Sequence, residues 1–146
     1  MITLAIMRQM ANDQVAGLTI DKNFFWEEAP LQKDGKIAEG VWIITRGGSA
    51  INTPHGINQK TTIDFYVAYN NKTTAEAKQA SIADWIRTNR VICNLNGTVG
   101  GNSYAFSNIR ITPTTTPQNY GTTENGNIVK LASASVVYDK GINTNS

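Results

Sequence analysis

The feature that most constrains the fold is an alternating run at residues 61–69, which a helical pattern follows at once. The apolar members of this run are Ile63, Phe65, Val67 and Tyr69. Such alternation is typical of a strand that has one face on the core. After a polar turn at 70–72, apolar residues recur at helical spacing up to about residue 90. We therefore predict a strand, a tight turn and a helix that packs on the sheet.

The helix is predicted over about 74–90, and Thr73 followed by Glu76 has the spacing of a capping box at its start. Its expected apolar stripe consists of Ala75, Ile82, Ala83 and Ile86, with Trp85 at the edge. A short helix is expected at 2–11, where one face bears Ile2, Ala5, Ile6 and Met10.

Four further strands are predicted from shorter apolar patterns, at about 18–26, 37–45, 104–112 and 128–138. Two stretches rich in glycine and polar residues, 46–59 and 113–127, are expected to be long loops. Loops of this length inside a compact domain are often functional. Since the strands are separated mostly by turns, we predict an α+β fold with a mostly antiparallel sheet of about five strands and two helices packed on one face.

The length of 146 residues fits one domain, and 40% of the residues are hydrophobic. A chain of this size buries about 70% of the surface that it exposes when unfolded. We therefore expect a single domain over residues 1–139 and a flexible C-terminal tail at 140–146.

The charge and the cysteine content argue against two kinds of function, nucleic-acid binding by bulk charge and chemistry at a reactive cysteine. The chain has 13 Lys and Arg against 11 Asp and Glu, a net charge of +2, which does not favour nucleic-acid binding by bulk charge. The single cysteine, Cys93, has apolar neighbours and is expected to be a buried, inert thiol. No signal peptide is recognisable, and no apolar run approaches the roughly 20 residues that span a membrane. We expect a soluble protein made in a cytoplasm, without a membrane partner.

The sequence has no recognisable catalytic constellation. His55 is the only histidine, and no cysteine or carboxylate stands at metal-ligand spacing from it. Nucleophile-elbow and phosphate-binding motifs are absent. Glu27 and Glu28 are adjacent, so in a strand they would point to opposite faces. Asp64 is expected on the solvent face of its strand. We expect no enzyme, no metal and no cofactor.

Several aromatic and apolar residues lie on strand edges or in the predicted loops and not on a core stripe. We take them, with their loop neighbours, as candidates for an assembly interface: Trp26, Trp42, Gly47, Gly48, Ile51, His55 and Tyr120. Trp26 and Trp42 also leave open a carbohydrate-binding module, in which aromatic rings stack on sugars.

The order of these elements resembles the tail terminator (tail completion, minor capsid) proteins of long-tailed bacteriophages over about residues 2–139. The resemblance includes the initial helix, the stretches FWEEAP (25–30) and GVWII (40–44), the strand IDFYVAY (63–69) with its helix, and the final ASVVYD (134–139).

The resemblance implies a structural virion protein, assembled in the host cytoplasm, that forms a hexameric ring on the head-proximal end of the tail tube. Its partners would be copies of itself, the tail tube protein and the head-side connector. The ring would stop tube growth, and DNA would pass through its lumen without sequence-specific binding. Other neck, head-completion or tail-tube proteins remain alternatives, as do a carbohydrate-binding module and an enzyme without a recognised motif.

Overall fold

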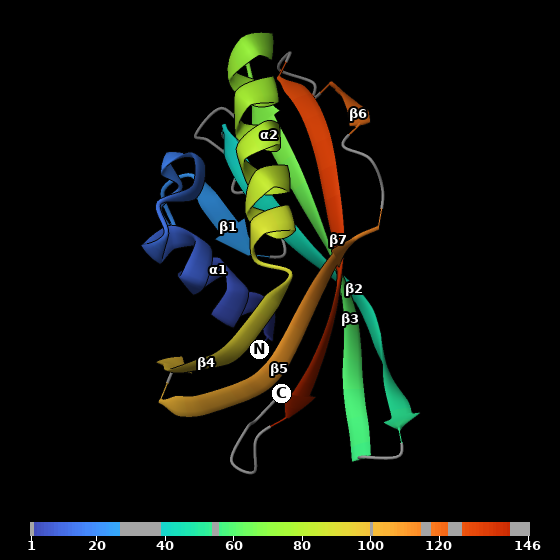
Figure 1. The fold of residues 1–146 in the computed structure, drawn as a ribbon. Coiled ribbons are helices and arrows are strands. Elements are labelled where there is room, and N and C mark those ends of the chain that lie inside the picture. Colours follow the sequence, from blue (N-terminus) through green and yellow to red (C-terminus); the bar gives the residue numbers. More distant parts are fainter. Residues whose placement is uncertain are drawn as a thin grey trace.

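The computed structural model describes residues 2–26, 39–53, 56–99, 101–114, 118–122 and 127–140, which form one curled sheet and two helices (Figure 1). The elements in chain order are α1 (Ile2–Asn12), the 3-10 turn η1 (Val15–Gly17), β1 (Phe24–Trp26), β2 (Gly40–Thr53), β3 (Gly56–Tyr69), α2 (Lys72–Thr88), β4 (Val91–Val99), β5 (Asn102–Pro113), β6 (Gln118–Thr122) and β7 (Ile128–Lys140). The predicted α+β class with two helices is confirmed.

The sheet is mixed and has more strands than predicted. The strand order is β1-β2-β3-β7-β5-β4, and β6 pairs with β7. Among the described strands only β1 and β2 run parallel. The expected number of about five strands is too low, because the described residues form seven; neither β4 nor β6 was predicted.

Strand β4 escaped prediction because its sequence is typical of a connection. Asn94 and Asn96 are exposed, and only Leu95 between them is buried. Gly97 also suggested a turn, but it lies in the strand, where a Cβ atom would be 2.5 Å from the hydroxyl oxygen of Tyr104. The glycine therefore allows close packing between β4 and β5.

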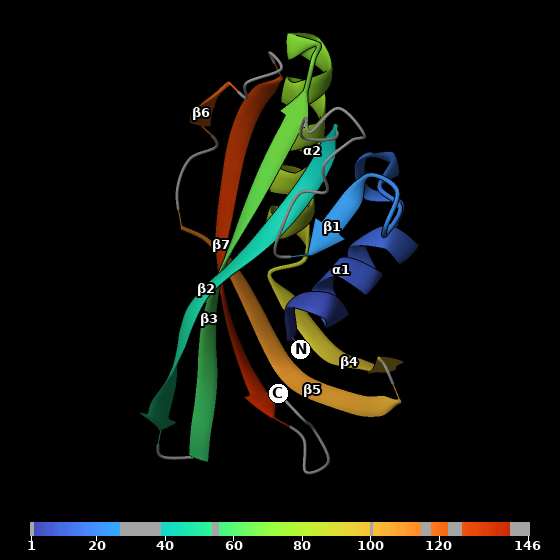
Figure 2. The same ribbon diagram turned by 180° about the vertical axis from the view of Figure 1, so that it is seen from behind.

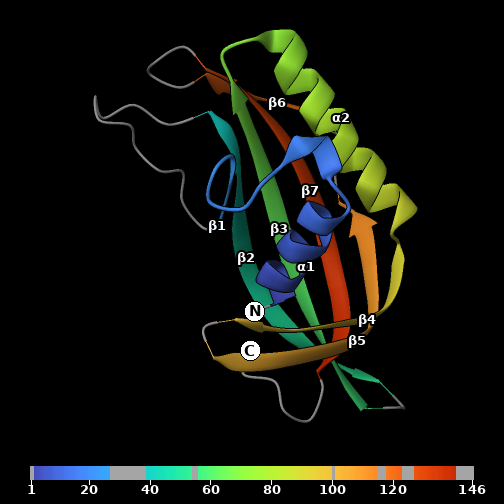
Figure 3. The ribbon, with the colours of Figure 1, turned by 90° about the vertical axis from the view of Figure 1, so that its left-hand side faces the viewer.

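Both helices contribute to one hydrophobic core. The predicted apolar face of α1 is confirmed, since Ile2, Ala5, Ile6 and Met10 are all buried. In α2, Ala75, Ile82, Trp85 and Ile86 are buried and Ala83 is half-buried. Helix α2 lies along the sheet, and α1 lies in the opening of the curl between β1 and β4 (Figures 1 and 3).

The start of α2 differs from the prediction. Asn71 is the N-cap, and its Oδ1 accepts hydrogen bonds from the backbone N–H groups of Thr73 and Thr74 at 2.9 and 3.2 Å. The predicted capping box of Thr73 and Glu76 is therefore wrong. An asparagine at the N-cap satisfies the same unpaired helix donors. Glu76 is left to interact with the sheet.

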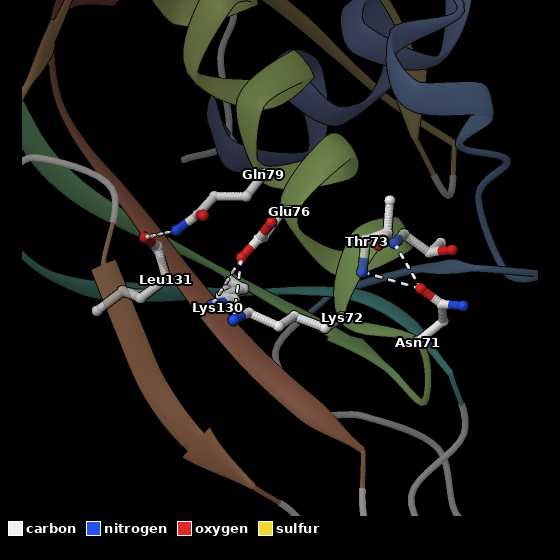
Figure 4. A network of polar contacts seen from close by, with 8 residues as sticks. Asn71, Lys72, Thr73, Glu76, Gln79, Lys130 and Leu131 are labelled. Carbon is white, nitrogen blue, oxygen red and sulfur yellow. Dashed lines mark hydrogen bonds and ion pairs between the residues drawn. The ribbon is translucent and has the colours of Figure 1, made fainter.

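A polar network joins α2 to β7 (Figure 4). The ammonium of Lys130, whose side chain is only 7% exposed, lies 3.7 Å from Glu76 Oε1. Lys72 lies 3.9 Å from the same oxygen, and Gln79 Nε2 donates to the carbonyl of Leu131 at 2.9 Å. Burying a lysine requires a compensating charge or hydrogen bonds. The network therefore helps to fix the position of α2 on β7.

The stretches expected to be long loops contain strands. Residues 46–59 belong largely to β2 and β3, which pair from Gly40 with Ala68 to Thr53 with Gly56. The stretch 113–127 contains β6, which pairs with β7. Polar composition with several glycines suggested loops in both places, but pairing with distant strands overrides such local preference.

Three smaller expectations also change. Only Phe24–Trp26 of the strand predicted at 18–26 is a strand. Cys93 is exposed on β4, not buried, because its apolar sequence neighbours do not determine the face of an edge strand. The last strand extends through Lys140, and residues 141–146 of the predicted tail lie outside the described part of the chain. Ile37, at the start of the strand predicted at 37–45, also lies outside it.

Candidate assembly surface

The distal half of the β2–β3 hairpin forms what we call the hairpin arm, residues 48–53 and 56–61. Pairing of β3 with β7 begins only at Gln59 opposite Tyr138, so among the described strands residues 56–58 pair with β2 alone. The arm projects beyond the end of the sheet in two opposite views (Figures 1 and 2). A two-stranded ribbon by itself is marginally stable in water.

A register shift marks the base of the arm. Arg46 lies opposite Thr62, and Gly48 lies opposite Thr61, so Gly47 is the extra residue of a β-bulge. Bulges bend a strand and increase its twist, and they often occur at sheet edges and near functional sites. The two glycines therefore set the direction in which the arm leaves the sheet.

The structure places most of the predicted interface residues on β1 and β2, the strands at one edge of the sheet. Gly48 and Ile51 lie in the arm, Trp42 lies nearer the start of the same strand, and Trp26 pairs with Ile43. Tyr120 is separate, because it lies at the register shift of β6, which pairs with β7. His55 lies outside the described residues.

The two tryptophans have different environments. Trp26 is 43% exposed at the end of β1. Trp42 is half-buried and stacks on Tyr66 directly across from it, with ring centroids 5.4 Å apart and an interplanar angle of 10°. Cross-strand aromatic pairs of this kind stabilise a sheet. Of the two, Trp26 has more apolar surface left for a partner.

A polar cluster on the face of β3 away from α2 was not predicted. Asp64 is 4% exposed, so the expectation of a solvent-facing carboxylate is wrong. Its Oδ2 lies 2.8 Å from Arg46 Nε, and its Oδ1 accepts from Ser133 Oγ at 2.6 Å. The Tyr66 hydroxyl lies 3.5 Å from Oδ2. The residues of this cluster come from β2, β3 and β7, and no local motif in the sequence indicates that they contact one another.

Two buried tyrosines have altered acidity. Burial, with a smaller contribution from the charge of Glu39, raises the pKa of Tyr69. Burial also raises the pKa of Tyr138, and a hydrogen bond with Thr61 partly opposes that rise. The hydroxyl oxygen of Tyr69 has no hydrogen-bond partner among the described residues.

The described residues include no group of three or more His, Cys, Asp or Glu side chains placed to hold a metal ion. Over the same residues, neither helix has the length and apolar character needed to cross a membrane. No known protein-family model matches the chain, and no curated protein matches it either.

Proposed function

We propose that this chain is a structural subunit of a bacteriophage tail, which assembles as a hexameric ring on the head-proximal end of the tail tube. The ring stops tube growth and joins the tail to the head-side connector, and DNA passes through its lumen. The hairpin arm is the observation that supports this proposal most directly. Its tip, residues 51–53 and 56–58, has no third strand beside it among the described strands, so a neighbouring molecule is the natural partner.

A ring requires a heterologous contact, in which two different patches of each subunit meet. The arm and the β1–β2 side with exposed Trp26 supply one such patch. The net charge of +2 is compatible with DNA passage, because a strongly basic lumen would hold the phosphates. In this proposal the helices occupy one face of a mostly antiparallel sheet, and the chain is not an enzyme.

The experiment is to shorten the arm and measure assembly. Residues 51–58, which among the described strands pair only within the hairpin, are replaced by Asn-Gly, which favours a tight turn between Ala50 and Gln59, the next paired residues. We expect the helical signal of the circular dichroism spectrum to be unchanged, because the removed residues do not pair with β7. We also expect loss of the closed oligomer, or of tube capping when purified tail tubes are supplied. An arm-shortened protein that assembles like the wild type would contradict the proposed role of the arm.

A further inference from the structure

Arg46 lies on the outer face of β2 and β3, the face away from α2. A buried carboxylate, Asp64, restricts the orientation of its side chain. Asp64 is buried, and its Oδ2 lies 2.8 Å from Arg46 Nε. Ser133 Oγ donates a hydrogen bond to the other carboxylate oxygen, Oδ1. The Arg46 side chain is nevertheless 57% exposed. Among the described residues Asp64 is the only acidic side chain that pairs with Arg46, and the closest contact is made by Nε and not by either of the two terminal nitrogens. Since the guanidinium is planar, fixing Nε also restricts the directions of these two nitrogens.

The fold alone does not require this arrangement. Removing a carboxylate from water is unfavourable, and hydrophobic residues in place of a buried ion pair are often as stable or more stable. Asp64 lies at the middle of β3 between Ile44 and Ser133 on the neighbouring strands, a position that a threonine or valine could fill. The ion pair is therefore better explained by the orientation of Arg46 than by stability.

The surroundings of Arg46 resemble the centre of a protein interface. On the same face the stacked rings of Trp42 and Tyr66 are half-buried, and Ile44 lies between Trp42 and Arg46 along β2. Tryptophan, tyrosine and arginine are the residue types most enriched at energetically important interface positions. A guanidinium can bind a carboxylate through two parallel hydrogen bonds.

We propose that this patch, formed by Trp42, Ile44, Arg46 and Tyr66, docks a protein partner that presents an aspartate or glutamate next to an apolar side chain. Arg46 binds the carboxylate, and the aromatic pair contacts the apolar group. Asp64 and Ser133 position Arg46. Because Asp64 balances the charge of Arg46, the pair adds no net attraction for a polyanion such as nucleic acid. The patch does not include the hairpin arm, so this inference does not depend on ring formation.

A random-peptide display library, selected on the folded wild-type chain, tests the proposal. We expect the recovered peptides to share an acidic residue beside an aromatic or aliphatic one. Changing that acidic residue to its amide should weaken binding about tenfold or more, as should Arg46→Gln in the protein. The two losses should not add in a double-mutant cycle, because both remove the same contact.

Matched variants distinguish a specific loss of the Arg46 contact from a general effect of removing a surface charge. Arg110→Gln removes another exposed arginine, on β5, and should leave binding unchanged. Arg46→Lys should not restore affinity, because an ammonium lacks the planar fork. Ser133→Ala should weaken binding while the melting curve shows a folded protein. The proposal is overturned if no peptide is recovered, if the recovered peptides lack an acidic residue, if the two losses are additive, or if Arg46 governs binding of a single-stranded oligonucleotide instead.

Discussion

Replacing Ile82 with alanine should destabilise the protein by removing a side chain that α2 places against the sheet. Ile82 has no exposed surface and belongs to the core cluster that both helices share. The change removes three carbon atoms, and each buried methylene contributes about 0.8 kcal/mol. The remaining cavity adds to this loss, so we expect a decrease of about 3–4 kcal/mol in the free energy of unfolding.

Urea denaturation followed by circular dichroism measures this loss, with Ile92→Ala as the control. Ile92 is only half-buried on β4, so the same substitution there should destabilise less. The dependence of the unfolding free energy on urea should stay unchanged, because the surface exposed on unfolding is nearly the same. A loss below about 0.5 kcal/mol for Ile82→Ala is typical of surface positions and would refute the described packing of α2.

Three further predictions follow from the polar groups. Asn71→Ala should lower the unfolding free energy by about 1 kcal/mol through loss of the N-cap, and an unchanged melting temperature would argue against that cap. Glu76→Gln should lower it by about 1 kcal/mol, because Lys130 loses a partner that is itself half exposed; a stabilised variant would show that the pair is unfavourable. Because burial raises the pKa of Tyr69 and Tyr138, their contribution to stability is fully present below about pH 10, the ordinary tyrosine pKa, and is lost as pH rises through the higher folded values. Thermal melts of Tyr69→Phe should therefore decline less above pH 10 than those of the wild type, and an identical decline would contradict the burial of this hydroxyl.

The sequence was most informative where local pattern and tertiary packing agree. The alternation at 61–69 predicted β3, and the apolar spacing at 75, 82 and 86 predicted the buried face of α2. The strand at 128–138 was also predicted closely. In these elements the buried face alone determines the periodicity, so no knowledge of the partner strand was needed.

The misses share a different physical cause. Gly47 and Gly48 suggested the end of a strand, but β2 continues through a bulge because β3 pairs with it. Asp64 was assigned to solvent from its polarity, yet Arg46 and Ser133 on neighbouring strands enclose it. Each outcome depends on which distant strands become neighbours, which local composition does not determine. The candidate interface stays a prediction: Trp26 is exposed, and Trp42 is half-buried and stacks on Tyr66.

The most direct test of the proposed function is the absolute mass of the purified wild-type chain, measured by light scattering alone and after mixing with tail tubes. We expect a closed species of six subunits, or a monomer that caps tube ends and stops their growth. A concentration-independent monomer that neither associates nor changes the length distribution of growing tubes would contradict it, and screening on a glycan array would then be the next experiment.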